Sequence, residues 1–477
     1  MTRRFRTLAL LTAATALSAC NLAPKYVRPV GAVPAELPRG WPYPAAASDA
    51  PEITRIGWRD FFTDARLRQV IETGLANNRD LRVAAANVLQ ARAQYRVQRA
   101  DLVPSTSISG SGTYTNNIAS LGGGAAAGGG GATSSNLEIY SVSAGFSSFE
   151  LDLFGRVRNL SRAAQERYFA SEEAQRSTRI SLIAEIATAW LTLASDQDQL
   201  ALAQDTLKAF AQTLDLTRAQ FRIGVASELE ARQAETNYQS ARNDIATLQT
   251  RIAQDRNALN LLAGTAVPAD QLPAGLNQGQ VTLDALPGDL SSQVLLRRPD
   301  VLQAEHQLIA ENANIGAARA AFFPRISLTA TIGTISTALS GLFAGGSFTY
   351  TGAPSATLPL FDAGRNAGNL AYARASQQAA VATYEKSIQT AFREVADALA
   401  TRGTIGEQIA AQTARVEAAQ VAARLSDARY RAGIDSFLTA LDAERTAYAA
   451  RQQLQTTRLA RASNLVELYR AFGGGLD

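Results

Sequence analysis

Four segments of the chain alternate apolar or small side chains with hydroxyl-bearing ones, which is the period of a β-strand with two different faces. These segments cover residues 105–115, 139–154, 325–335 and 348–360. In the second, the apolar phase changes between Phe146 and Phe149, which predicts a bulge or the point where the strand leaves a bilayer. Strands of about ten residues with one apolar face are typical of outer-membrane barrels. A half-buried sheet of a soluble protein has the same period, so the strands alone leave that alternative open.

The segments that follow the strands show the period of very long helices. Residues 156–221 contain no proline, and Ile183, Ile186 and Trp190 belong to an apolar stripe with spacings of three and four. A helix over this segment would be roughly 100 Å long, at about 1.5 Å per residue. A return helix is expected over residues 227–263, and the pair recurs over 364–431 and 435–472.

The chain contains two copies of one unit. Gly224 and Gly433, each at the expected turn of a helical pair, are 209 residues apart, and so are Arg156 and Arg365. The segments that end at Pro104 and Pro324 are related by a shift of 220 residues, so the first copy holds 11 residues more between its proline and its arginine. The glycine-rich stretch 121–131 can supply all of them, as a longer loop between two strands.

The duplication sets the expected domain organisation. The ranges are a signal peptide at 1–20, an extended arm at 21–62, a first repeat at 63–290 and a second repeat at 291–477. The first repeat holds strands within about 104–154, helices within about 156–263 and a connector at 264–290. The second holds strands within about 324–361, helices within about 364–472 and a C-terminal tail.

Four strands cannot close a barrel, because the smallest membrane barrels have about eight. Several chains must therefore pool their strands, and a cyclic trimer would give twelve. The predicted fold is mainly α with a β-barrel part. Long antiparallel helical hairpins form a periplasmic α-barrel, and trimerisation completes a twelve-stranded barrel from four membrane strands per chain.

The first 20 residues predict export. Three arginines precede the apolar run 8–17, and small residues lead to Cys20, the single cysteine of the chain. This pattern resembles a bacterial lipobox, in which Cys20 carries diacylglycerol on its thiol and palmitate on its amino group. Asn21 in place of aspartate favours the outer membrane over the inner one. A plain secretory signal with an incidental cysteine is the alternative.

Composition argues against an enzyme, a metal protein or a nucleic-acid binder. The formal charge of +4 falls to about +1 after the signal, because residues 1–20 contain three arginines and no acid. His306 is the single histidine, so we interpret it as a surface or interface residue rather than a metal ligand or catalytic base. The glycine-rich stretch lacks the lysine of a phosphate-binding loop and is expected to be an extracellular loop. No cofactor is expected apart from the lipid on Cys20.

Several short motifs together resemble the outer membrane factors of tripartite efflux systems, the lipoprotein branch of the TolC-like channels. They are Leu22-Ala23-Pro24-Lys25-Tyr26, Trp58-Arg59-Asp60-Phe61-Phe62, Leu153-Phe154-Gly155-Arg156, Arg298-Pro299-Asp300-Val301, Ile315-Gly316-Ala317-Ala318-Arg319 before Phe323-Pro324, and Leu468-Tyr469-Arg470 before Gly473-Gly474-Gly475. The resemblance covers the whole mature chain. It implies a homotrimer that spans the outer membrane lipid, extends into the periplasm, and docks a periplasmic adaptor (membrane fusion protein) and an inner-membrane resistance-nodulation-division pump.

The function that follows is the exit duct of a tripartite pump, through which small molecules such as drugs cross the outer membrane passively. A channel for exported polypeptides, as in a type I-like secretion system, would share this architecture and stays open. A trimeric coiled-coil adhesin fits less well, because its strands would normally lie together at one end of the chain, whereas here they lie inside each repeat.

The helical turns carry the first set of candidate site residues. Gly224, Val225, Ser227, Gly433 and Ser436 are expected to contact the hairpin tips of the adaptor, because long helices separate these turns from the strands. The alternative is that they are turn residues only.

A second set of candidate residues follows the Gly433 turn. Leu438 and Asp442 are four residues apart and share one helix face. The family resemblance implies that the matching positions form the constriction of the resting channel, so Leu438, Asp442 and Arg445 are the expected periplasmic gate. The alternative is a solvated pair of Asp442 with Arg445, worth less than about 1 kcal/mol.

Overall fold

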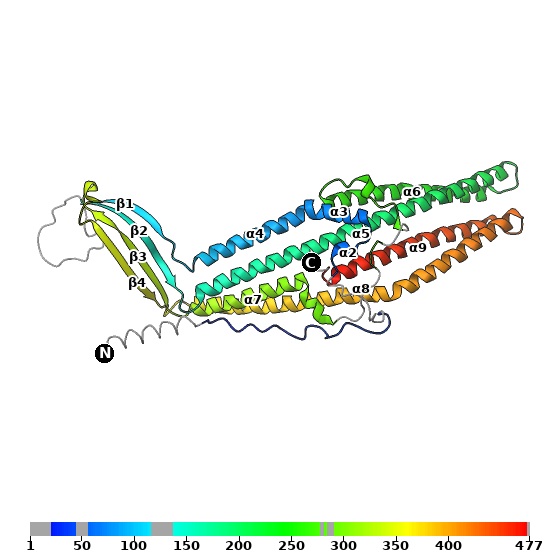
Figure 1. Ribbon diagram of the computed structural model, residues 1–477. Coiled ribbons are helices and arrows are strands. Elements are labelled where there is room, and N and C mark those ends of the chain that lie inside the picture. The colour runs from blue at the N-terminus through cyan, green and yellow to red at the C-terminus, as the bar shows by residue number, and fades with distance from the viewer. Residues whose placement is uncertain (1–20, 44–55, 116–136, 277–280, 284–290, 475–477) are drawn as a thin grey trace. The chain divides into compact units, whose positions relative to one another are not determined.

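Two helices of 67 residues, α5 (Arg156–Arg222) and α8 (Arg365–Arg431), dominate the computed structural model (Figure 1). The structure describes residues 21–43, 56–115, 137–276, 281–283 and 291–474. The chain divides into two compact units. The first contains residues 21–28, 88–170 and 304–383, and the second contains 29–87, 171–303 and 384–474, each within the described ranges.

The first unit contains one antiparallel sheet with the strand order β1-β2-β3-β4. The strands are β1 (Ser107–Thr115), β2 (Leu137–Leu151), β3 (Arg325–Ser336) and β4 (Phe348–Thr357). One face carries hydroxyl groups that meet across the strands, since the Oγ atoms of Ser111 and Ser141 are 2.8 Å apart. The other face exposes large apolar side chains, among them Ile108 and Tyr350. The four predicted strands and their two-faced character are therefore confirmed.

The predicted phase change in the second strand is a β-bulge. The pairing of β2 with β3 shifts between Phe146 and Phe149, and Ser148 has a φ of 55°. The bulge corrects the expected loop length, because the stretch from Ser143 to Arg156 is one residue longer than the equivalent stretch from Ala353 to Arg365. Ser143 and Ala353 occupy equivalent places in the two hairpins and are 210 residues apart, against 209 for Arg156 and Arg365. One of the 11 extra residues is therefore the bulge, and the loop supplies ten, not all of them.

Two of the remaining helices, α6 (Glu228–Ala263) and α9 (Phe437–Ala471), lie close to the predicted ranges 227–263 and 435–472. The structure adds α2 (Trp58–Phe61), α3 (Ala65–Asn77), α4 (Arg79–Ala100) and α7 (Pro299–Ala320), which lie outside the two predicted helical pairs. Short 3-10 helices occur at η3 (Ala269–Gln271), η5 (Ser292–Arg297) and η6 (Leu339–Gly341). Among the helices that the structure describes, none has an apolar stretch long enough to cross a membrane.

Small side chains contribute to the packing of α8 against α9 in the second unit. Val416 and Ala419 of α8 form a buried cluster with Ala447, Ala450 and Leu454 of α9. Three of these five residues are alanines, so the alanine-rich composition takes part in the core between the two helices.

A buried arginine ties the start of α7 to two other helices in the second unit. The side chain of Arg298 is only 6% exposed. Its guanidinium donates to the carboxylates of Asp300 at 2.7 Å and Glu394 at 2.9 Å, and to the backbone oxygen of Ala471 at 2.7 Å. The two carboxylates balance the positive charge of Arg298, and the hydrogen bonds replace those that the guanidinium would make with water, so the buried charge is tolerated.

The arm after Cys20 is held along α5 and α7 in the first unit. Asn159 donates to the side-chain oxygen of Asn21 at 2.9 Å, and Arg319 donates to the backbone oxygen of Leu22 at 3.1 Å. Cys20 itself lies outside the described residues. The first described residues of the arm are thus fixed by specific hydrogen bonds.

Candidate functional site

The first helical turn, between α5 and α6, ends its helix with glycine in the left-handed conformation. Gly224 has a φ of 76°, and its amide donates to the Phe221 oxygen at 3.0 Å. The amide of Val225 reaches back to the Gln220 oxygen at 2.9 Å, which completes a Schellman motif. Ser227 then caps α6 in a reciprocal capping box with Glu230.

The second turn, between α8 and α9, repeats this backbone with different side chains. Gly433 has a φ of 72°, and the amide of Ile434 donates to the Arg429 oxygen at 2.9 Å. Ser436 caps α9 by accepting from the Thr439 amide. The Arg429 guanidinium donates to both oxygens of Asp435, at 2.6 and 2.9 Å, and thereby holds the pKa of that carboxyl below its usual value.

The two turns of one chain are joined to each other. The Tyr430 hydroxyl donates to the side-chain oxygen of Gln220 at 2.9 Å, a contact between residues 210 positions apart. Beneath it, Leu214 of α5 and Ala234 of α6 form a buried cluster with Phe437 and Leu441 of α9. The structure therefore brings the five predicted tip residues together at one end of the second unit.

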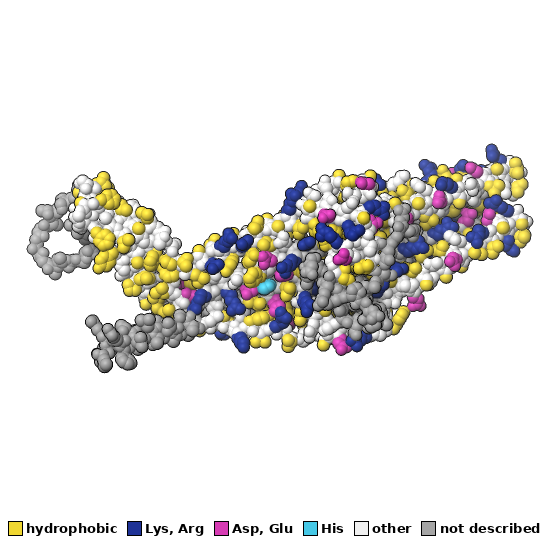
Figure 2. All heavy atoms as spheres, in the orientation of Figure 1, with side chains coloured by type: hydrophobic (Ala, Val, Ile, Leu, Met, Phe, Trp, Pro, Cys, Tyr) yellow, Lys and Arg dark blue, Asp and Glu magenta, His cyan; other side chains and the backbone are white. Residues whose placement is uncertain are grey.

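The turns display apolar side chains to the outside. Ile223 is 75% exposed, Val225 71% and Ile434 64%. Hydrophobic side chains are visible at the ends of both helical pairs in Figure 2. A Cβ atom added at Gly224 or Gly433 would meet nothing within 4 Å, so the space around both turns is open within this chain. Ile223 and Ile434 were not among the predicted contact residues, although both directly adjoin a turn glycine.

The predicted gate residues share the exposed side of α9. Leu438, Asp442 and Arg445 are all exposed, whereas Phe437 and Leu441 on the other side are buried in the cluster described above. In the described part of the chain, Asp442 and Arg445 form no ion pair. The three side chains are thus available to a neighbouring molecule.

A titratable group that the sequence did not indicate lies on the same helix. Glu444 of α9 lines a cavity of about 320 Å³ together with residues of α5 and α8. Its Oε2 atom is buried and has no hydrogen-bond partner. Burial, and secondly the nearby Asp427, raise the pKa of Glu444 to about 6, against the opposing effect of Arg431. Helix period alone could not identify Glu444, because its burial depends on which helices pack against α9.

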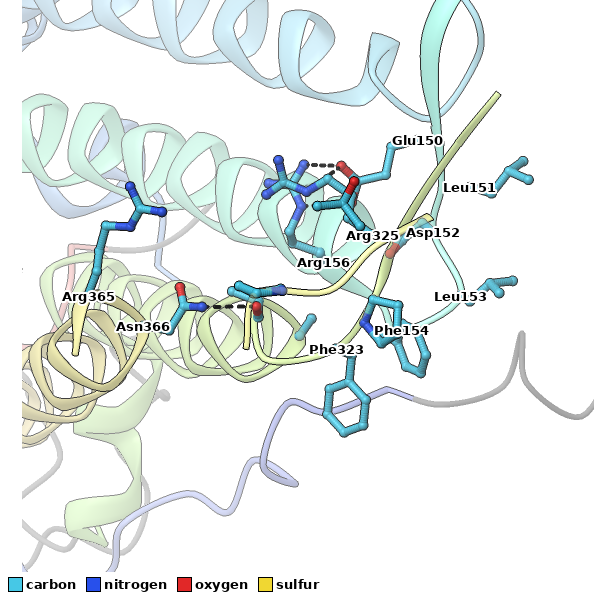
Figure 3. A pocket seen from close by; sticks show the side chains of 15 residues that line it. Glu150, Leu151, Asp152, Leu153, Phe154, Arg156, Phe323, Arg325, Arg365 and Asn366 are labelled. Atoms are coloured by element: carbon cyan, nitrogen blue, oxygen red, sulfur yellow. Dashed lines mark hydrogen bonds and ion pairs between the residues drawn. The ribbon is translucent and has the colours of Figure 1, made fainter. Parts of the chain in front are cut away.

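A second cavity of about 320 Å³ lies in the first unit where the strands meet the helices (Figure 3). Glu150 of β2 accepts two hydrogen bonds from Arg156 of α5, at 2.8 and 2.6 Å, and lies 3.5 Å from Arg325 of β3. The rings of Phe154 and Phe323 stack beside it with centroids 4.7 Å apart. The Glu150 carboxylate raises the pKa of Arg156 and holds both guanidinium groups at the base of the sheet.

His306 of α7 contacts two residues of α5. Its Nδ1 atom is 2.8 Å from Glu166, and its ring packs against Phe169. Among the described residues, no group of three histidine, cysteine, aspartate or glutamate side chains could hold a metal ion. The predicted lipidation site Cys20 and the glycine-rich stretch 121–131 lie outside the described residues.

Comparison with known proteins identifies the class to which this architecture belongs. The sequence profile described as outer membrane efflux protein matches the chain twice, at residues 70–265 and 290–474. The toluene efflux pump outer membrane protein TtgC of Pseudomonas putida is 46% identical over 469 residues, which span 98% of this chain and 95% of that protein. The cation efflux system protein CusC of Escherichia coli is 41% identical over 463 residues, which span 97% and 98%.

Solved structures agree with this assignment. The open state of the Neisseria gonorrhoeae MtrE outer membrane channel superposes with a TM-score of 0.83 at 38% identity, covering 96% of this chain and 99% of that one. A membrane protein from Pseudomonas aeruginosa superposes with a TM-score of 0.86 at 40% identity, covering 96% and 98%. The chain belongs to the outer membrane efflux protein family. It is an efflux channel of the outer membrane that extends into the periplasm, as the sequence motifs predicted.

Proposed function

We propose that this chain is the exit duct of a tripartite pump, in which three copies pool their strands and helices and pass small molecules passively across the outer membrane. The observation that carries the proposal is the four-stranded sheet with β1 and β4 at open edges and a large apolar face exposed. Lipid cannot satisfy unpaired backbone groups, so a sheet that enters a bilayer must be closed by further strands. Identical chains supply those strands without additional sequence.

The names of the relatives favour small molecules over polypeptides as the exported substrate. The relatives are named for efflux of toluene, of antibiotics and of cations, all of which are small solutes. The decisive experiment compares a deletion strain with the complemented strain for drug susceptibility and for the secreted protein profile. Increased susceptibility with an unchanged profile is expected. Loss of secreted polypeptides with unchanged susceptibility would assign the channel to protein secretion.

The proposal includes a covalent lipid on Cys20, as diacylglycerol on the thiol and palmitate on the amino group. The apolar run 8–17 and the small residues that lead to Cys20 support it. Asn159 and Arg319 then fix the next two residues, Asn21 and Leu22, by hydrogen bonds. Labelling with a radioactive fatty acid should mark the wild-type protein and not the Cys20→Ser variant. Equal labelling of both would refute lipidation at this residue.

The helical turns are the proposed docking surface for a periplasmic adaptor linked to an inner-membrane resistance-nodulation-division pump. The open space around Gly224 and Gly433 and the exposed Val225 support this role, with Ser227 and Ser436 as the adjoining caps. Val225→Trp should abolish efflux while the oligomer stays intact, and suppressors should arise in the adaptor. Suppressors confined to this chain would indicate a turn residue without a docking role.

The proposed periplasmic gate consists of Leu438, Asp442 and Arg445. Their exposure on one side of α9 supports the assignment, because three such faces around a channel axis would make a leucine ring beside a carboxylate ring. Like charges held close repel each other, so Arg445 is the group available to offset the carboxylates.

A further inference from the structure

The sheet has two open edges, strands β1 and β4, which can pair with each other between neighbouring protomers. We propose that β4 of one protomer pairs with β1 of the next in an antiparallel ladder without a bulge, with Ser355 opposite Ser111 of the neighbouring protomer. This inference rests on the homotrimer of the proposed function. It adds the residue pairs that form the seam between protomers.

The internal duplication determines the pairing. Strand β2 is the second strand of the first copy and β3 is the first strand of the second copy, so the β2–β3 ladder is the seam between two copies within one chain. Strand β4 is the second strand of the second copy and β1 is the first strand of the first copy. The seam between chains must therefore join β4 to β1 in the manner in which β2 joins β3, because equivalent surfaces make equivalent contacts in a cyclic assembly.

The register of the β2–β3 ladder can be transferred to β4 and β1 from residues before and after the bulge. Before the bulge, Ser143 pairs with Gly333, and the equivalents of these residues are Ala353 and Thr113. After the bulge, Phe149 pairs with Leu328, and the equivalents are Leu358 and Ile108. Both transfers give the same register between β4 and β1, because the extra residue of β2 has no counterpart in β4. The seam between chains therefore contains no bulge, in contrast to the seam within the chain.

The side chains agree with this register on both faces. On the hydroxyl face it places Ser355 opposite Ser111 and Thr351 opposite Thr115. Within the chain, Ser355 already lies 2.7 Å from Ser327, and Ser111 lies 2.8 Å from Ser141, so the proposed pair joins two hydroxyl rows into one. A slip by one residue would turn hydroxyl positions toward the apolar face.

On the apolar face, a large side chain meets an empty position. The register places the aromatic ring of Tyr114 opposite Gly352 of the neighbouring protomer. Tyr114 is exposed, and a Cβ atom added at Gly352 would meet nothing within 4 Å in this chain. An aromatic ring packed over a glycine of the adjacent strand is a known means of fixing strand register.

The two seams differ at the base of the sheet. Within the chain, Glu150 links Arg156 of α5 to Arg325 of β3. The equivalents in the seam between chains are Pro359, Arg365 and Ser105, so the central carboxylate is missing there. The proposed seam between protomers therefore depends on its ladder and on packing, without the ion pairs that support the seam inside the chain.

Engineered disulfides test the register directly. Directly opposite residues have Cα atoms about 4.5 to 5.5 Å apart, within the range of a disulfide, whereas diagonal neighbours are about 7 to 8 Å apart. The double variant Ser111→Cys with Ser355→Cys should link most of the protein into dimers and closed trimers on a non-reducing gel. Each single-cysteine variant controls for Cys20, the one native cysteine.

Three further pairs make the outcome decisive. Ser111→Cys with Ser141→Cys should form a disulfide inside each chain, because the two hydroxyl oxygens are already 2.8 Å apart. Ser109→Cys and Thr113→Cys, each combined with Ser355→Cys, represent slips of two residues and should stay unlinked. Linking by a slipped pair, or no linking of an assembled trimer whose internal control forms, overturns the register and leaves the proposed function standing. A protein with the mass of one chain overturns the proposed function instead.

Discussion

At the scale of single residues, the turn glycines hold a backbone conformation that other L-residues adopt at a cost of about 1 to 2 kcal/mol. Gly433→Ala should therefore destabilise the second turn by about that amount, since its φ is 72° and no neighbour would contact the new methyl group. Hydrogen exchange at the amide of Ile434, which closes the turn, should accelerate about tenfold, because about 1.4 kcal/mol is one decade.

Gly406 provides the matched control for this substitution. It lies inside α8, also has no atom within 4 Å of an added Cβ, and does not have a positive φ. Gly406→Ala should stabilise the helix by up to about 1 kcal/mol, because alanine is the better helix former. If both variants changed hydrogen exchange at the Ile434 amide equally, the left-handed conformation of Gly433 would not be what determines the stability of the turn.

Glu444 should make the stability of the second unit depend on pH. Its pKa of about 6 in the folded chain exceeds the ordinary value of 4.5, so the folded state favours the protonated carboxyl. The stabilisation from protonation is complete below about pH 4.5 and is lost as the pH rises through about 6. Glu444→Gln should raise the thermal midpoint at pH 7 and have less effect at pH 5.

The exposed Glu407 of α8 is the control residue for this pH dependence. Glu407→Gln should move the midpoints at both pH values equally. A Glu444→Gln variant with the same pH dependence as the wild type would show that this carboxyl does not carry the effect.

At the scale of elements, the buried Arg298 joins α7 to α8 and α9 in the second unit. Arg298→Ala should cost about 3 to 5 kcal/mol, because it breaks a buried ion-pair network. The backbone oxygen of Ala471 loses its donor, and Glu394 keeps only the longer contact with Arg470, at 3.6 Å. The thermal midpoint of the variant should fall accordingly.

Arg232 of α6 is the surface counterpart of Arg298. It pairs with Glu228 and Glu235 while its side chain is 69% exposed, so Arg232→Ala should lower the thermal midpoint far less than Arg298→Ala. If Arg298→Ala and Arg232→Ala had similar thermal midpoints, burial would not explain the contribution of Arg298 to the stability of the fold.

Much of the element structure could be predicted from local sequence. The ends of α6 and α9 follow from Ser227 and Ser436 as caps, and the bulge follows from the phase change after Phe146. The contacts between elements could not be predicted in this way. The bond from Tyr430 to Gln220 joins residues 210 positions apart, and no helix period contains that information.

The candidate sites show the same division. The turn glycines were predictable because a left-handed backbone selects for glycine, as the φ angles of Gly224 and Gly433 show. The ion pair of Arg429 with Asp435 and the burial of Glu444 were not predicted, since both depend on how a turn closes and on which helices pack together.

At the scale of the whole molecule, the proposed gate should control ion flow through the assembled channel. Leu438→Ala with Asp442→Ala should raise the conductance in planar bilayers and lower the preference for cations, because it widens a constriction and removes a carboxylate ring. The same variant should admit antibiotics in cells.

The duplication supplies a matched control for the gate. The equivalent positions of the first copy are Leu229 and Gln233 of α6, which carry the leucine but no carboxylate. Leu229→Ala with Gln233→Ala should leave the cation preference unchanged. Unchanged conductance in a correctly assembled Leu438→Ala, Asp442→Ala variant would place the constriction elsewhere.

One chain is an incomplete channel by this proposal, because its four strands leave β1 and β4 as open edges. The most direct test is the mass of the purified protein in detergent, measured by light scattering with the detergent contribution subtracted. We expect the protein mass of three chains, each of 50.6 kDa before removal of the signal. A monodisperse protein with the mass of one chain would show that the barrel is not built from the strands of three chains.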